Sequence, residues 1–266
     1  MEYLYLWLNI GSFIIPFLFS FHPRLRFYRK WKQLFTGILV MMAIFIPWDI
    51  LFTHHGIWGF NPDYLIGIDI LGLPLEEWLF FICIPYACIF THYALLELFP
   101  GFRFGKYASA SIYLAIVTTL ILVLWYYYDR WYTLVNFSFG LFILALVQSM
   151  RKQLLPSFFA TYLVILIPFF IVNGILTGTG ITEPVVWYNN AENLGIRLKT
   201  IPVEDLIYNL GMLLTVYLFL KLFRPGNQKI VLTEVSYPVK IELSHCPIVQ
   251  HPFSELGSSR LCRLER

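Results

Sequence analysis

The sequence predicts an all-α polytopic membrane protein in which seven transmembrane helices form two parallel three-helix repeats joined by a connector helix. Three observations predict this fold: a composition suited to lipid, seven long apolar stretches and an internal repeat. Hydrophobic residues make up 58% of the 266-residue chain and charged residues only 13%, whereas soluble domains carry about 25% charged residues. The formal net charge is +3, and no basic stripe interleaved with aromatic residues points to a nucleic-acid partner.

The apolar stretches have the length that a membrane-spanning helix needs. A bilayer core of about 30 Å requires about 20 apolar helical residues. Seven stretches meet this requirement: Tyr3–Phe21, Gln33–Phe52, Glu76–Leu98, Tyr107–Tyr128, Trp131–Met150, Ser157–Leu176 and Val203–Phe223. Trp and Tyr gather at several of their ends, as expected at membrane interfaces. The first stretch follows a start that lacks the basic residues of a cleaved signal, so we expect it to remain as a span.

Basic residues in the predicted loops determine the expected orientation. The first, third and fifth loops, together with the segment after the seventh stretch, hold 11 Lys and Arg residues, and the loops on the other side hold 3. Cytoplasmic loops carry the excess of positive charge in membrane proteins. We therefore expect an outside N-terminus and a cytoplasmic C-terminus, in the cytoplasmic membrane of a bacterium.

The internal repeat relates the first three predicted helices to the last three. One constant shift along the chain superimposes Asn61 on Asn189, and Pro74-Leu75-Glu76-Glu77 on Pro202-Val203-Glu204-Asp205. A single connector helix keeps the two copies parallel, and parallel repeats place equivalent residues at equal depth in the membrane. The predicted parts are a first repeat, a connector helix, a second repeat and a polar C-terminal tail, at residues 1–106, 107–130, 131–224 and 225–266.

Two acidic pairs, Glu76-Glu77 and Glu204-Asp205, follow the prolines at the heads of the third and seventh predicted helices. Proline suits a first helical turn, and acids there are stabilised by the helix dipole, so a capping role is one interpretation. Acids in apolar surroundings are costly, however, and their presence indicates function. Burial and neighbouring acids would keep one carboxyl protonated as a general acid. Because the motif is duplicated, we predict that the catalytic residues are Glu76, Glu77, Glu204 and Asp205, and that both pairs, with Glu76 and Glu204 among them, belong to one active site.

Four further residues are candidates for supporting roles beside these acids. A slightly smaller shift, which aligns the second helix of each copy, places Asn173 at the position of Asp49. Either side chain could orient a motif carboxyl by a hydrogen bond or serve as a polar cap at the membrane interface. Trp78 and Tyr208 belong to an aromatic group near the acids, where ring faces could stabilise a cation or simply anchor the membrane interface. Asp63 and Asp69 precede the third predicted helix, and we expect both to be solvated.

Other motifs count against metal and cofactor chemistry. The pair His54-His55 lacks the further histidines that a membrane di-iron site needs, so we expect no metal. The segment Gly178-Thr179-Gly180 has Glu183 where a dinucleotide motif needs its last glycine, and no strand precedes it. We therefore expect no bound cofactor. Four cysteines form no recognisable disulfide framework, and Lys221 at the end of the seventh stretch is misplaced for a retinal Schiff base.

The three-one-three helix plan and the motifs Pro74-Leu-Glu-Glu-Trp-Leu-Phe-Phe81 and Pro202-Val-Glu-Asp-Leu206 resemble the lycopene cyclase domain. This family includes heterodimer-type bacterial and archaeal lycopene cyclases and the cyclase region of fungal bifunctional carotenoid enzymes. The resemblance covers residues 1–224, with both halves fused in one chain. The tail departs from it, and Asp205 replaces the second Glu, which the family pattern tolerates.

The resemblance implies cyclisation of lycopene ψ-ends to β-ionone rings without net redox change, as an intramolecular lyase or isomerase. An acid protonates the terminal double bond, the neighbouring double bond attacks the cation, and a base removes a ring proton. The implied substrate is a carotenoid dissolved in the bilayer, and association with other carotenoid enzymes is left open. The residues do not distinguish which carboxyl is acid and which is base, nor whether one or both ends are cyclised.

A transporter is the main alternative. Sugar transporters of the SWEET type share the three-one-three parallel plan. They usually carry Pro-Gln kinks, which this sequence lacks, and a transporter would line a polar path across the membrane, whereas the polar groups here gather at one end. Another isoprenoid-modifying membrane enzyme is the third interpretation. The cyclase is the function that the sequence favours.

Overall fold

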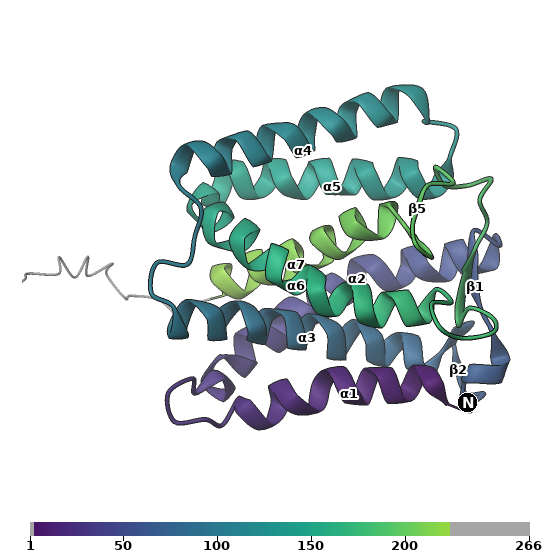
Figure 1. Cartoon of the computed structure of the whole chain (residues 1–266), viewed down its shortest axis with the longest axis horizontal. Helices are drawn as coiled ribbons and strands as arrows, with labels where there is room; N and C mark the ends of the chain where they lie inside the picture. Colours follow the sequence, from purple (N-terminus) through teal and green to yellow (C-terminus); the bar gives the residue numbers. More distant parts are fainter. Residues whose placement is uncertain (1–2, 224–266) are drawn as a thin grey trace, which may run out of the picture. The chain divides into compact units, whose positions relative to one another are not determined.

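The computed structural model describes residues 3–223 and is all-helical there apart from short loop strands; the predicted tail at 225–266 lies outside the described residues. The helix ends lie close to the predicted ones. The helices are α1 (Leu4–Phe19), α2 (Trp31–His54), α3 (Leu75–Leu98), α4 (Lys106–Tyr126), α5 (Trp131–Arg151), α6 (Leu155–Leu176) and α7 (Glu204–Leu222) (Figure 1).

Several of these helices are long and apolar enough to cross a membrane. In the described part, five stretches qualify: Phe27–His54, Leu75–Leu98, Lys106–Tyr126, Trp131–Leu176 and Glu204–Leu222. The fourth has 46 residues and contains both α5 and α6, and α1 is a shorter apolar helix. The chain is therefore a membrane-embedded helical protein, and the count of seven spans remains a prediction.

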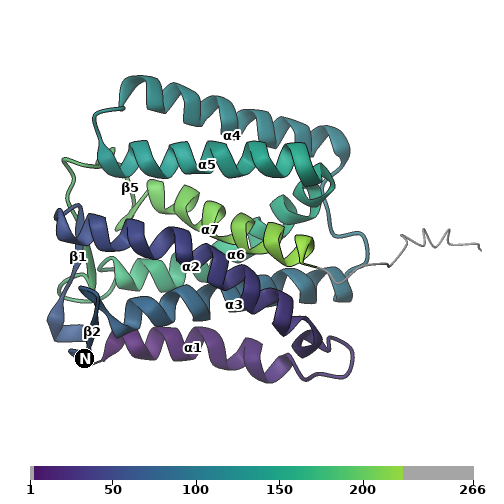
Figure 2. The same ribbon diagram turned by 180° about the vertical axis from the view of Figure 1, so that it is seen from behind.

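The helices of the described part lie side by side, with α1 and α4 on opposite sides (Figures 1 and 2). Helix α1 packs along α3, and α5 packs along α7. Helix α2 packs mainly on α7, α6 contacts α3, and α4 packs on α5. The loops that precede α3 and α7 lie at the same end of the helices (Figure 1).

These two loops are joined by a small antiparallel sheet. Strand β1 (Trp58–Phe60) pairs with β4 (Val186–Tyr188), so that Trp58 lies opposite Tyr188. Two backbone bonds flank the sheet: Asn61 N donates to Val185 O at 2.8 Å, and Asn189 N donates to Ile57 O at 2.9 Å. The heads of α3 and α7 are therefore held together by the loops that lead into them.

Each loop ends in a hairpin that delivers the chain into its helix. The strands are β2 (Asp69–Ile70) with β3 (Leu73–Pro74), and β5 (Arg197–Leu198) with β6 (Ile201–Pro202). Leu71 and Lys199, which are equivalent in the two copies, both adopt the left-handed conformation, with φ of 55° and 59°. This conformation is unfavourable for both side chains, so its recurrence indicates that the two hairpins need the same turn to start α3 and α7.

Candidate active site

A cavity of about 470 Å³ lies between α1, α3, α6 and α7, and β1 and β4 line its loop end. Its wall is mostly apolar, but three carboxyl side chains reach it: Asp49 from α2, Glu77 from α3 and Asp205 from α7. All three are buried, with exposed fractions of 2%, 8% and 5%. Burying an ionised carboxyl is costly unless it is well hydrogen-bonded, so the partners of each acid decide its state.

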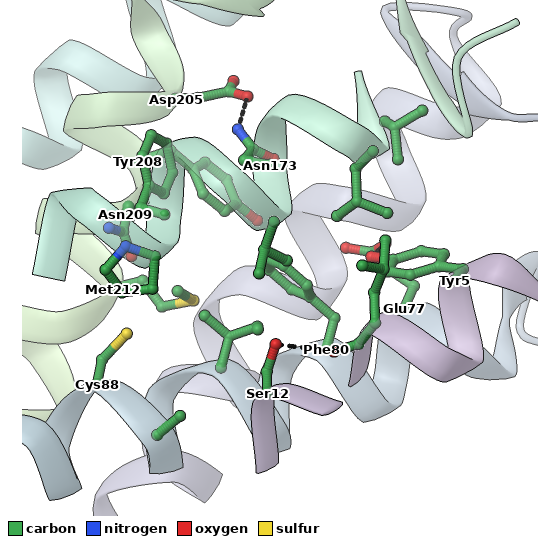
Figure 3. A pocket seen from close by; sticks show the side chains of 18 of the residues that line it. Tyr5, Ser12, Glu77, Phe80, Cys88, Asn173, Asp205, Tyr208, Asn209 and Met212 are labelled. Carbon is green, nitrogen blue, oxygen red and sulfur yellow. Dashed lines mark hydrogen bonds between the residues drawn. The ribbon is translucent and has the colours of Figure 1, made fainter. Parts of the chain in front are cut away.

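Glu77 lies in the first turn of α3 and is bound by helix α1. The Tyr5 hydroxyl donates to Glu77 Oε2 at 2.5 Å. One turn further along α1, Asn9 Nδ2 donates to the backbone oxygen of Glu76 at 2.8 Å, which fixes α1 against the head of α3. Figure 3 shows the Glu77 carboxyl beside the Tyr5 ring, facing the pocket. Tyr5 therefore positions the Glu77 carboxyl at the cavity.

Asp205 lies in the first turn of α7 and accepts three hydrogen bonds. Tyr132 of α5 donates to Oδ1 at 2.5 Å, and Tyr188 of β4 donates to Oδ2 at 3.0 Å. Asn173 of α6 also donates to Oδ2, at 2.7 Å (Figure 3). Asn136 Nδ2 donates to the backbone oxygen of Glu204 at 2.7 Å, as Asn9 does at α3. Three donors on one carboxyl favour its ionised form.

Tyr188 is the loop residue among these donors. Burial and the neighbouring Asp205 raise the pKa of Tyr188 well above its usual range. Its hydroxyl therefore keeps its proton at neutral and moderately alkaline pH. A protonated phenol can donate to Asp205, so this contact persists across that pH range.

Glu76 and Glu204 occupy a different position from the one the sequence predicts. Neither lines the cavity, and both are completely buried, with exposed fractions of 0%. Glu76 Oε1 accepts from Ile66 N, and Glu204 Oε1 accepts from Leu194 N, each at 2.6 Å. Each acid thus holds the loop before its helix. The expectation that Glu76 and Glu204 face a shared cavity is wrong, because Glu77 and Asp205, the next residues along the two helices, line the cavity in their place.

The other predicted residues divide between the cavity and the surface. Tyr208 and Asn173 line the cavity together with Asp49. Trp78 does not, since its indole is directed to the loop, where Nε1 donates to Ile70 O at 3.2 Å. Asp63 and Asp69 are exposed, as expected for solvated loop acids, and so are His54 and His55. Within residues 3–223, no group of three or more His, Cys, Asp or Glu side chains is arranged to hold a metal ion.

Three tyrosines that bind the acids were missed by the sequence reasoning. Aligning the first helix of each copy superimposes Tyr5 on Tyr132 and Asn9 on Asn136, so the pattern Tyr-x-x-x-Asn opens both helices. This repeat was visible in the sequence and could have identified both pairs. Tyr188 carries no comparable signal, because Phe60 stands at its position in the first copy.

The fold and the cavity together define a class: a membrane-embedded helical protein with an apolar pocket that buries carboxyl groups. Comparison with known proteins identifies the family. A family model described as lycopene cyclase matches residues 2–95 and 129–223, which leaves out the α4 region. The chain belongs to the lycopene cyclase family.

Curated relatives agree with this assignment over shorter segments. The chain is similar to a bifunctional lycopene cyclase/phytoene synthase of Aspergillus oryzae, 30% identical over 76 residues, or 27% of this chain and 13% of the relative. It is also similar to a protein with the same description from Neurospora crassa, 38% identical over 53 residues, or 19% of this chain and 9% of the relative. The matched segments thus span only a small part of these longer proteins. No solved structure matches the chain.

Proposed function

We propose that the protein cyclises the linear ends of lycopene to β-ionone rings by acid–base catalysis, without net redox change. The observation that carries this proposal is the placement of Glu77 and Asp205 on one apolar cavity. An acid, a base and a dry pocket are sufficient for a cyclisation that begins with protonation of a carbon–carbon double bond. The family assignment supports carotenoid cyclisation in general, and the β product is part of the proposal.

The hydrogen bonds support different roles for the two acids. Asp205 accepts from three donors, an arrangement that favours a carboxylate, and we assign it as the base. Glu77 accepts only from Tyr5 among the described residues, and Asp49 and Asp205 share its cavity. Like charges in one low-dielectric cavity disfavour full ionisation. We therefore assign Glu77 as the protonated general acid.

The proposed reaction conserves atoms and electrons. Glu77 gives its proton to the terminal double bond of the polyene and leaves a tertiary cation. The neighbouring double bond attacks this cation, so a carbon–carbon bond closes the ring and the positive charge moves onto it. Asp205 then removes a ring proton and restores a double bond. One proton is gained and one is lost, so the product is an isomer of the substrate.

The cavity wall suits a carbocation. Trp58, Phe80 and Tyr208 line the cavity near the acids, and aromatic faces attract cations. Water would capture the cation, so an apolar pocket that excludes water protects the intermediate. A polyene that is dissolved in the bilayer is a substrate that such a pocket can receive from the membrane, and the proposed mechanism needs no cofactor or metal.

Two further features of the proposal concern the architecture. Equivalent loop hydrogen bonds recur in the two copies: Leu75 N donates to Ile68 O, and Val203 N donates to Ile196 O. This recurrence supports two parallel three-helix repeats joined by α4, which would give seven spans. The excess of Lys and Arg in the first, third and fifth loops supports an outside N-terminus, with both acids near the non-cytoplasmic face.

Expression of the chain in a cell that accumulates lycopene, followed by chromatography of the pigments, tests the function. We expect products of unchanged mass that carry β-ionone rings. Cells with the empty vector should retain only the linear pigment. Unchanged lycopene in cells that contain the inserted protein would contradict the proposal.

A further inference from the structure

The cavity has no open counterpart in the second copy. Aligning the first two helices of the copies relates Ser12 to Phe139, Phe169 to Phe45, and Val172 to Trp48. Ser12, Phe169 and Val172 all line the cavity. At the equivalent place, the Phe139 ring packs with its centroid 5.1 Å from that of Phe45 and 6.2 Å from that of Trp48. The large side chain therefore occupies the space that Ser12 leaves open.

Helix α7, which faces Phe139, has a glycine where it meets this ring. A Cβ atom at Gly211 of α7 would lie 3.2 Å from the Phe139 ring, tighter than most such contacts. The residue equivalent to Gly211 in α3 is Cys83. Phe139 and Gly211 thus fit together between α5 and α7, whereas α1 and α3 enclose free space beside Ser12.

The α2–α7 pair and the α3–α6 pair, which are equivalent in the two copies, differ in how closely their helices approach each other. A Cβ atom at Gly37 of α2 would lie 2.8 Å from the backbone oxygen of Val216 in α7, so α2 and α7 pack almost backbone to backbone. The equivalent of Gly37 in α6 is Thr161. Thr161 Oγ1 and His92 Nδ1 of α3 form a buried 2.7 Å hydrogen bond. These larger side chains hold α6 away from α3, on the side where the cavity lies.

The cavity reaches the lipid-facing side of α1. Trp7 and Ile15 line it, although their side chains are 63% and 62% exposed. Gly11 lies between them, and a Cβ atom built there would meet nothing within 4 Å. The wall of the cavity therefore includes exposed apolar residues of α1.

We propose that the cavity between α1, α3, α6 and α7 is a single cyclisation chamber that admits one end of a linear polyene at a time from the lipid beside α1. Position 12 determines whether the chamber is open. This inference rests on the proposed function for the identity of the ligand. Formation of two rings then requires the one-ringed product to leave and re-enter with its other end, since the equivalent space beside Phe139 is filled.

A size series at position 12 tests the chamber. Ser12→Val should lower ring formation, and Ser12→Phe should lower it by about 100-fold or more, because the second variant installs the side chain that fills the equivalent space in the second copy. Ser138→Phe is the matched control, since Ser138 is the equivalent of Gly11 and is exposed on α5. Ring formation by Ser138→Phe should equal that of the unmodified protein. Equal ring formation by Ser12→Phe and Ser138→Phe would overturn the inference.

Labelling of Cys88 with N-ethylmaleimide separates this inference from the proposed function. Cys88 lines the cavity and, like Ser12, is labelled in Figure 3. In a protein with Cys83, Cys246 and Cys262 changed to Ser, Ser12→Phe should slow Cys88 labelling about 10-fold or more in the absence of any carotenoid. Ser138→Phe should leave the rate unchanged. Labelling that is insensitive to Ser12→Phe and Ser12→Val contradicts the chamber, whereas slowed labelling in a protein that forms no rings contradicts only the cyclase assignment.

The time course of the products tests entry by one end. With substrate in excess over enzyme, free one-ringed product should appear before any two-ringed product. Two-ringed product that accumulates from the first turnover, without free one-ringed product, would overturn the single-end chamber.

Discussion

Glu76 and Glu77 are consecutive residues in the first turn of α3, yet their carboxyl groups have different partners. Glu76 Oε1 accepts from the backbone of Ile66 at 2.6 Å, and Glu77 Oε2 accepts from the Tyr5 hydroxyl at 2.5 Å beside the cavity. Successive residues on a helix point about 100° apart, so one acid holds the loop and the other faces the pocket. Glu204 and Asp205 divide their contacts in the same way.

The first prediction concerns the loop-binding acid. Glu76→Ala removes the acceptor for Ile66 N and should lower the free energy of unfolding by about 1–3 kcal/mol, the usual cost of an unsatisfied buried group. Ring formation per folded molecule should stay close to that of the unmodified protein. The midpoint of thermal unfolding in detergent and a pigment assay at matched protein level check both parts. Full stability together with lost activity would place Glu76 in the chemistry.

The second prediction concerns the tyrosines. Tyr132→Phe removes one donor from Asp205, and Tyr5→Phe removes the donor of Glu77. A hydrogen bond contributes about 0.5–1.5 kcal/mol to a neutral group such as protonated Glu77, and about 1.5–3 kcal/mol to a charged group such as the Asp205 carboxylate. We therefore expect ring formation to fall by up to about 10-fold in Tyr5→Phe and by up to about 100-fold in Tyr132→Phe. The loss in Tyr132→Phe should stay below this upper limit, because Asn173 and Tyr188 still donate to Asp205. A single-turnover assay measures this loss, and a change confined to protein yield would indicate a purely structural role.

Much of the fold could be predicted from composition and apolar length, because a helix in lipid needs about 20 apolar residues whatever its neighbours are. The acidic motif was also visible. The sequence does not show which side of the helix each acid occupies, since this depends on the hairpins that start α3 and α7. The direction of the Trp78 side chain likewise cannot be predicted from the sequence. Its indole faces the backbone of Ile70 and not the cavity. Tyr188 reaches Asp205 only because β1 and β4 pair although they are far apart in the sequence.

The third prediction concerns the source of the proton that starts the cyclisation. If Glu77 exchanges with solvent and then protonates the polyene, each ring formed in heavy water should carry one added deuterium. The proton that Asp205 removes comes from the substrate, so the product mass should rise by one unit per ring. Mass spectrometry of the purified pigment measures this rise. Rings formed in heavy water without deuterium would exclude a solvent-exchanging acid as the initiator.

The fourth prediction concerns orientation. Reporter fusions after Arg24 and after Gly67 should lie in opposite compartments, with the Arg24 fusion cytoplasmic, because the basic residues gather in the first loop. Each site is fused once to an enzyme that is active only in the cytoplasm and once to an enzyme that is active only outside it. The two activities then locate each site independently. The same compartment for both fusions would refute the predicted topology.

The central claim is that Glu77 and Asp205 act together as acid and base in one cavity. Ring formation from lycopene by Glu77→Gln and Asp205→Asn, each at matched levels of inserted protein, tests it most directly. Both substitutions keep the size of the side chain and remove its acid–base function, and such groups contribute about 10²–10⁴-fold in rate. We expect each variant to lose activity by this factor, while Glu76→Gln, which keeps its acceptor, and Asp63→Asn in the exposed loop stay near the unmodified rate. Near-normal ring formation by either Glu77→Gln or Asp205→Asn would contradict the account.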